Sequence, residues 1–153
     1  MDGLHLTRLD PSARWLMRPG FFTEVERELA ARSFREFVQQ AWHVLEPKTV
    51  FVPGFHIDAI CEHLEAISFG RIRNLLINVP PRHMKSLLVS VFWPASEWTR
   101  WPERRFLYSS YAANISVRDS VKCRRLIESP WFQRRWGHVF SLTGDQNRQG
   151  ALR

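Results

Sequence analysis

A strand–turn–helix pattern over residues 75–92 constrains this chain more than any other stretch. An apolar run ends at two prolines, and a second apolar run begins directly after Lys85 and Ser86. A helix that begins there would offer unpaired N–H groups and a positive dipole end to a phosphate. The lysine would add a point charge for the outer phosphates, and the serine hydroxyl could ligate magnesium. The spacing therefore favours a phosphate-binding loop over residues 80–86.

The loop departs from the usual pattern G-x-x-x-x-G-K-[ST] at both glycine positions, which hold Val79 and Met84. Glycine normally lets the backbone approach the phosphates and take a positive φ angle. A buried strand, a diproline turn and a helix with a merely solvated Lys85 would have the same spacing. The pattern alone leaves both interpretations open.

Composition indicates one domain with a basic surface. The chain has 153 residues and a net charge of +7, from 22 Lys+Arg against 15 Asp+Glu. Such a charge favours nucleic acid or another polyanion as a partner, although a solvated basic face would fit it too. A helix predicted from Asn114 or Ser116 to Ser129 concentrates the DNA-binding candidates, which are Arg118, Lys122, Arg124 and Arg125.

Cysteine spacing and hydropathy exclude several classes of protein. Cys61 and Cys123 lie far apart with no C-x-x-C pair, which favours buried free thiols over a zinc site or a disulfide framework. Free thiols fit a reducing cytoplasm. No apolar run approaches the roughly 18 residues of a membrane span, and no secretory signal is visible, so no membrane contact is expected.

Apolar periodicity predicts an alternation of helices and strands. Residues 1–22 are expected to form a loose leader. From Thr23, helical spacing up to Pro47 predicts one helix of about 23 residues, or two with a break near residues 31–33. Further segments follow in chain order: helix 55–68, strand 72–79, a helix from 87 to 98 or 101 with a kink or a break at Pro94, strand 105–111, the basic helix, a helical turn at 131–136 and a third possible strand at 139–142.

Alternating strands and helices predict an α/β fold with a parallel sheet. Ligands of such sheets bind at the carboxyl ends of the strands, where Pro80–Ser86 would lie. This context favours phosphate binding over the purely structural interpretation of the loop.

The loop and its flanks resemble one known family. Pro80-Pro-Arg-His-Met-Lys-Ser86 after Leu-Leu-Ile-Asn-Val is similar to the variant Walker A loop of tailed-phage terminase large subunits, the ATPase motors that thread viral DNA into the procapsid. Other stretches resemble the same family in order and spacing over residues 33–147: 34–38 with Trp42, 53–58, 61–64, 105–111, 118–120, 123–130 and 142–147.

The resemblance implies a partial P-loop NTPase fold, a parallel sheet flanked by helices with additional N-terminal helices and an incomplete sheet. Residues 23–147 would be the N-terminal portion of the ATPase domain, and residues 148–153 a divergent tail. ATP and Mg²⁺ are the implied cofactors. The implied partners are double-stranded DNA, the small terminase subunit and the portal or procapsid in the host cytoplasm, with oligomers only in the full-length motor.

The resemblance also assigns roles to residues. Lys85 would contact the β- and γ-phosphates, Ser86 would hold Mg²⁺, and Arg82 would act in cis on the γ-phosphate as an arginine finger. The remaining nucleotide-binding candidates are Pro81, His83 and Met84 in the loop, with Phe55 and His56 on the adenine side.

Two features of the family are missing from this chain. These are the acidic Walker B strand, which holds magnesium and positions water, and the C-terminal nuclease domain. The expectation is a truncated terminase that binds ATP but does not hydrolyse it efficiently alone. The alternative is a non-enzymatic basic module that binds DNA or a protein partner. A third interpretation is a chain whose central strand has an unpaired, aggregation-prone edge.

Overall fold

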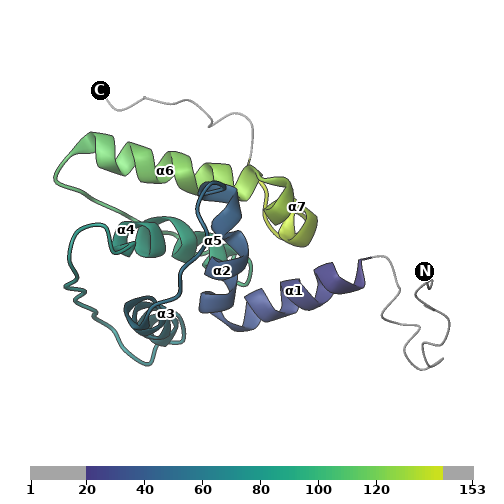
Figure 1. Ribbon diagram of the computed structural model, residues 1–153, viewed down its shortest axis with the longest axis horizontal. Helices are drawn as coiled ribbons and strands as arrows, with labels where there is room; N and C mark the ends of the chain where they lie inside the picture. The colour runs from purple at the N-terminus through teal and green to yellow at the C-terminus, as the bar shows by residue number, and fades with distance from the viewer. Residues whose placement is uncertain (1–19, 143–153) are drawn as a thin grey trace, which may run out of the picture.

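The computed structural model describes residues 20–142, and within that range every regular element is a helix (Figure 1). In chain order the elements are α1 (Phe21–Arg32), α2 (Phe34–Leu45), α3 (Phe55–Ser68), α4 (Lys85–Leu87), the π-helical turn η2 (Leu88–Phe92), α5 (Trp93–Trp98), α6 (Ala113–Glu128) and α7 (Pro130–Trp136). The residues that join α4, η2 and α5 all have right-handed helical backbone angles, so residues 85–98 form one continuous helix, called here the central helix.

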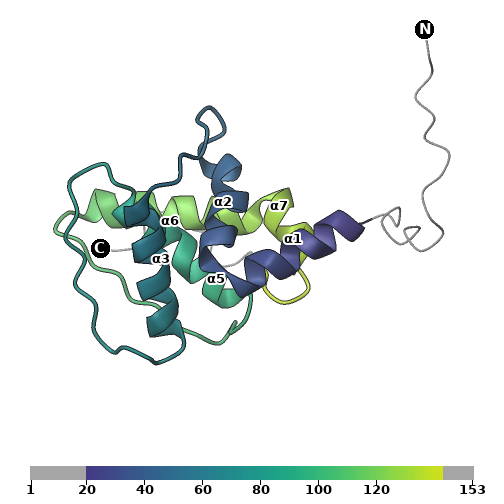
Figure 2. The same cartoon turned by 60° about the horizontal axis from the view of Figure 1, so that its bottom comes forward.

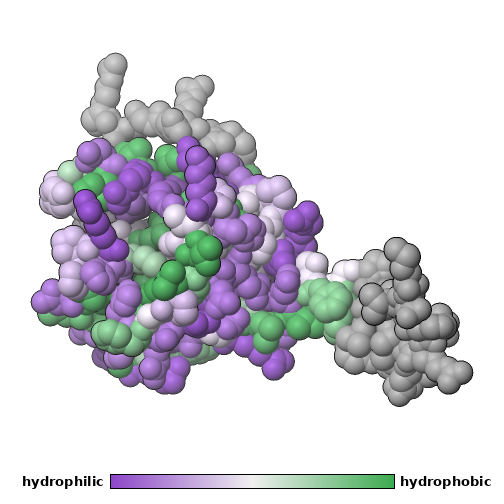
Figure 3. Space-filling model, in the orientation of Figure 1, coloured by the Kyte–Doolittle hydropathy of each residue, from purple (hydrophilic) through white to green (hydrophobic). Residues whose placement is uncertain are grey.

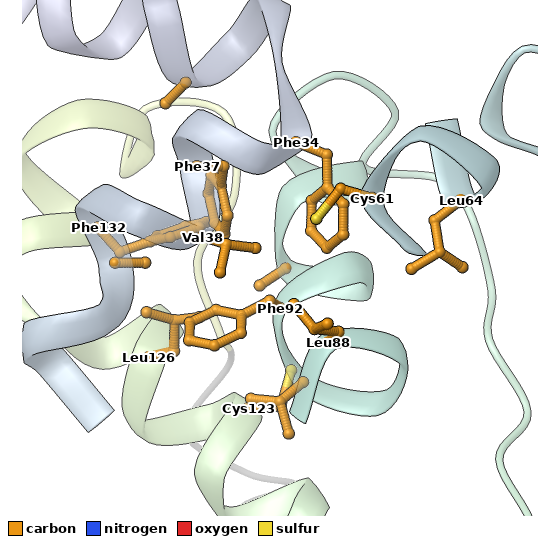
Figure 4. Packing of buried hydrophobic residues seen from close by; sticks show 14 of the residues in the cluster. Phe34, Phe37, Val38, Cys61, Leu64, Leu88, Phe92, Cys123, Leu126 and Phe132 are labelled. Atoms are coloured by element: carbon orange, nitrogen blue, oxygen red, sulfur yellow. The ribbon is translucent and has the colours of Figure 1, made fainter. Parts of the chain in front are cut away.

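The central helix and α2 form the middle of the molecule. The α3 helix packs against both of them, and α6 packs against them as well, while α1 contacts α2 and α7 (Figures 1 and 2). The largest fully buried side chains come from this layer and its neighbours; they include Phe37, Phe92, Phe132, Leu88 and Leu126 (Figure 4). Removing these apolar side chains from water is the main force that holds the central helix in place.

Ser33 separates α1 from α2. Its backbone is extended, with φ −133° and ψ 123°, and its Oγ accepts a hydrogen bond from the N–H of Glu36 at 3.4 Å. A serine in this position satisfies one of the unpaired donors at the start of a helix. Of the two alternatives for this region, the pair of helices is confirmed. The first helix begins at Phe21, inside the predicted leader, and the leader up to residue 19 lies outside the described residues.

Most of the other predicted helices are confirmed. The bounds of α3, α6 and α7 agree with the predictions within a few residues. Of the kink or break predicted at Pro94, the break is wrong: the helix continues through Pro94 and widens into the π-helical turn just before it. There the N–H of Trp93 bonds to the carbonyl of Leu88, five residues back.

The predicted α/β fold is wrong, and with it the partial P-loop sheet. Neither 72–79 nor 105–111 forms a β-strand, and no ladder joins them within residues 20–142. Side chains in the first segment nevertheless alternate. Leu75 and Ile77 pack against the core, whereas Leu76 between them is 93% exposed. Alternation is a property of one extended chain, but a sheet needs a second backbone about 4.8 Å away.

The second segment shows the same alternation. Phe106 and Tyr108 are half-buried, and Leu107 between them is 96% exposed. Residues 139–142 are not a strand either, because the N–H groups of Val139 and Phe140 donate to the carbonyl of Trp136 in a turn after α7. The inner faces of these segments are covered by helices, so their apolar side chains are buried without any strand pairing.

Helix α1 keeps an apolar stripe on its surface. Phe22, Val25 and Leu29 follow helical spacing and remain exposed, and Figure 3 shows apolar side chains over this helix among hydrophilic neighbours. None of the helices in the described part of the chain is long and apolar enough to span a membrane.

Candidate phosphate-binding site

The loop that precedes the central helix contains two residues in the left-handed backbone region. Arg82 has φ 68° and Met84 has φ 59°, and neither is glycine. Such a conformation costs about 1–3 kcal/mol per residue and is concentrated at functional sites. Met84 thus has the positive φ that the usual loop pattern obtains from glycine. The side chain of Met84 is half-buried against the core, which helps to hold it there.

Lys85 and Ser86 begin the central helix and are both exposed. Met84 provides no side-chain cap, so the first N–H groups of the helix lack a capping partner. Within residues 20–142, neither Lys85 nor Arg82 has an ion-pair partner. Unpaired donors, a positive dipole end and two uncompensated cations within four residues make this helix start suited to an anion.

The structure brings His56 and His83 together from distant parts of the chain. Their ring centroids lie 5.2 Å apart with an interplanar angle of 73°. Phe55 contacts His56 edge-on at 5.9 Å and is itself 87% exposed. An aromatic group therefore lies beside the loop, at the start of α3. The proline residue Pro81 contributes its carbonyl, which lies 3.0 Å from Nδ1 of His83.

The basic residues predicted to bind DNA on α6 have different surroundings. Lys122 Nζ lies 2.8 Å from Glu46 Oε1 at the end of α2, and Arg118 Nη2 lies 2.8 Å from Asp119 Oδ1. Arg124 lines a cavity, and Arg125 is exposed. The predicted basic face is thus partly neutralised by acidic side chains.

The residues of the loop fit a nucleotide's phosphates better than a free metal ion. No cluster of three or more His, Cys, Asp or Glu side chains suited to a metal occurs in the described residues. Mg²⁺ commonly binds through one or two protein oxygens together with the substrate's phosphates. The hydroxyl of Ser86 could supply one such oxygen once a nucleotide is bound.

Both cysteines are free and buried, as predicted. Burial raises the pKa of the Cys61 thiol to about 12, with a further contribution from the negative charge of Glu65. Burial alone raises the pKa of the Cys123 thiol to about 12. The thiols are therefore protonated at neutral pH and unsuited to nucleophilic chemistry.

Sequence reasoning did not foresee a cavity of about 490 Å³ between α5, residues 106–110 and α6. Asp119 lines it and is buried, and the hydroxyl of Tyr108 is buried there without a hydrogen-bond partner in the described residues. Burial also raises the pKa of Tyr108. The signal in the sequence was Asp119, one of two acidic residues in a basic helix.

The comparisons with family models, with curated proteins and with solved structures found no match for this chain. Its function is therefore inferred from its residues and their geometry.

Proposed function

We propose that this chain binds the phosphates of ATP, together with Mg²⁺, as the nucleotide-binding part of a tailed-phage DNA-packaging motor. One observation carries the proposal: Lys85 and Ser86 start a helix whose preceding residue, Met84, has the positive φ that a phosphate loop requires. A loop in this shape can direct backbone N–H groups toward an anion. The resemblance of the flanking stretches to terminase large subunits supports the part of the proposal that names a DNA-packaging motor and its DNA substrate.

The residues have distinct roles in this proposal. Lys85 neutralises the outer phosphates, and the Ser86 hydroxyl supplies an oxygen to Mg²⁺, which screens phosphate charge when bound. Arg82, which has no acidic partner in residues 20–142, would act in cis on the γ-phosphate when ATP is bound. Phe55 and His56 provide an aromatic surface for the base. The small terminase subunit, portal and procapsid would be its partners in the host cytoplasm.

Replacing Lys85 with alanine is expected to weaken Mg²⁺–ATP binding by about 10- to 100-fold. Hydrogen bonds to charged groups contribute about 1.5–3 kcal/mol, which corresponds to that range of dissociation constants. Isothermal titration of the full chain with Mg²⁺–ATP measures the effect. Lys48→Ala is the matched control, because Lys48 is an exposed lysine in the connection between α2 and α3. Equal affinity of wild type and Lys85→Ala would overturn the proposal.

A second candidate function is binding of double-stranded DNA through α6. Arg118 and Arg125 lie seven residues apart, on one side of the helix, and both are exposed. The Arg118 side chain keeps 56% of its surface exposed despite its pairing with Asp119. Two phosphate contacts from this stripe would make DNA binding depend on salt.

The double variant Arg118→Ala/Arg125→Ala is expected to reduce the slope of log K against log salt by about two, one for each lost phosphate contact. Fluorescence anisotropy with a labelled duplex at several salt concentrations measures the slope. Arg32→Ala/Lys48→Ala removes the same charge from exposed positions on other elements. If both double variants change the slope equally, only the net charge matters and α6 has no special role.

A further inference from the structure

We infer that His83 is a positioning residue that holds the phosphate loop in its binding shape; this inference rests on the proposed function. His83 lies between Arg82 and Met84, the two residues with positive φ. A loop with two such residues and no glycine tends to relax toward other backbone angles. An interaction from within the loop must therefore oppose that relaxation.

The side chain of His83 makes such an interaction. Its Nδ1 lies 3.2 Å from the carbonyl oxygen of Pro80 and 3.0 Å from that of Pro81. Because a carbonyl oxygen only accepts, Nδ1 carries the proton and donates it to this pair. One ring nitrogen thus ties together the two peptide carbonyls at which the chain turns.

These two carbonyls matter for an anion site. A carbonyl oxygen carries partial negative charge, and one that turned toward a bound phosphate would repel it. By holding both carbonyls at its own ring, His83 leaves backbone N–H groups as the polar groups that can face the ligand. The His83 side chain thereby stabilises a loop backbone that glycine residues would adopt without steric cost.

The ring of His83 is itself supported by α3. Its edge contact with His56 gives the ring a second contact, in addition to the two loop carbonyls. His56 in turn lies against Gly54, where an added Cβ would be only 2.9 Å from Cε1 of His56. Gly54, His56 and His83 therefore lie next to one another, and this contact from α3 helps to set the His83 ring in position.

Three variants at position 83 test this role. Asparagine places a side-chain N–H close to the position of histidine Nδ1, whereas the amide of glutamine reaches toward the position of Nε2. His83→Ala and His83→Gln are expected to weaken Mg²⁺–ATP binding by about 5- to 10-fold, the value of one hydrogen bond, while His83→Asn stays within about twofold of wild type. The thermal unfolding midpoint should be the same in all of them, because His83 is exposed.

Titration of the full chain with Mg²⁺–ATP, with Lys85→Ala alongside, separates the possible outcomes. Loss of binding in Lys85→Ala and His83→Ala with recovery in His83→Asn supports the role. Wild-type affinity of His83→Ala, or equal weakness of His83→Asn and His83→Ala, overturns it while Lys85→Ala still shows the site. Wild-type affinity of Lys85→Ala instead overturns the proposed function.

Discussion

Replacing Phe92 with alanine is expected to lower the free energy of unfolding by about 3–5 kcal/mol, the range for truncating a buried phenylalanine. Phe92 is 0% exposed and lies on the π-helical turn of the central helix, seven residues after Lys85. The loss combines the transfer free energy of the ring with the cavity that it leaves. Because the same helix begins with Lys85 and Ser86, ATP affinity should fall as well. Urea unfolding followed by tryptophan fluorescence measures the stability.

Phe22→Ala is the matched control for this variant. Phe22 is 68% exposed on α1, so its truncation should change stability by less than about 0.5 kcal/mol. Phe92→Leu should cost less than Phe92→Ala, since it keeps most of the buried volume. If Phe92→Ala were as stable as Phe22→Ala, the central helix could not be packed as the structure has it.

Replacing Arg104 with methionine is expected to cost about 2–3 kcal/mol of stability. Glu97 on α5 has a side chain that is only 4% exposed, and it pairs with Arg104 Nη1. Breaking a fully buried pair costs about 3–5 kcal/mol, because one charge remains uncompensated. Arg104 is 34% exposed, so water would partly compensate Glu97, and the lower value is expected.

The Arg104 guanidinium also connects two distant segments. Its Nη2 donates to the carbonyl of Ser68 at 2.9 Å, and its Cζ lies 3.7 Å from the ring centroid of Trp101. The double variant Glu97→Gln/Arg104→Met should recover part of the stability, since no charge is then left buried. The exposed pair in α1 provides the control, because Arg32→Met should cost less than about 0.5 kcal/mol. Equal costs for Arg32→Met and Arg104→Met would contradict the described burial of Glu97.

The helices could be predicted because their signals are local. Apolar residues three and four positions apart place one face of a helix against the core, and Ser33 marks where α2 begins. The buried thiols followed from the same spacing, since Cys61 and Cys123 lie on those apolar faces.

The sheet could not have been excluded in this way. The alternation around Leu76 and Leu107 is present in the structure, and it is the same alternation that a strand would show. Within residues 20–142, no second extended segment lies beside either one to form a β-ladder. The residues of a single segment do not determine whether another segment will pair with it. The alternation of buried and exposed side chains therefore correctly predicted that both segments are extended, but it wrongly predicted that they pair as strands.

The basic helix illustrates the same limit for charges. Four cations were visible on α6, but Lys122 pairs with Glu46, which is 76 positions away in the sequence. Packing of the helices likewise decides the contact between His56 and His83. It also decides that Arg104, which pairs with Glu97, donates to the carbonyl of Ser68 as well.

The loop at residues 80–86 depends both on its local sequence and on the tertiary structure. The sequence by itself determined that a lysine and a serine follow a diproline turn at the start of a helix, because adjacency in the chain is enough to place them there. Only the tertiary structure decided that Met84 has a positive φ, that His83 turns back to two carbonyls and that His56 lies against it. Left-handed angles at non-glycine residues are costly in isolation, so they persist only where contacts within the loop and from the rest of the fold maintain them.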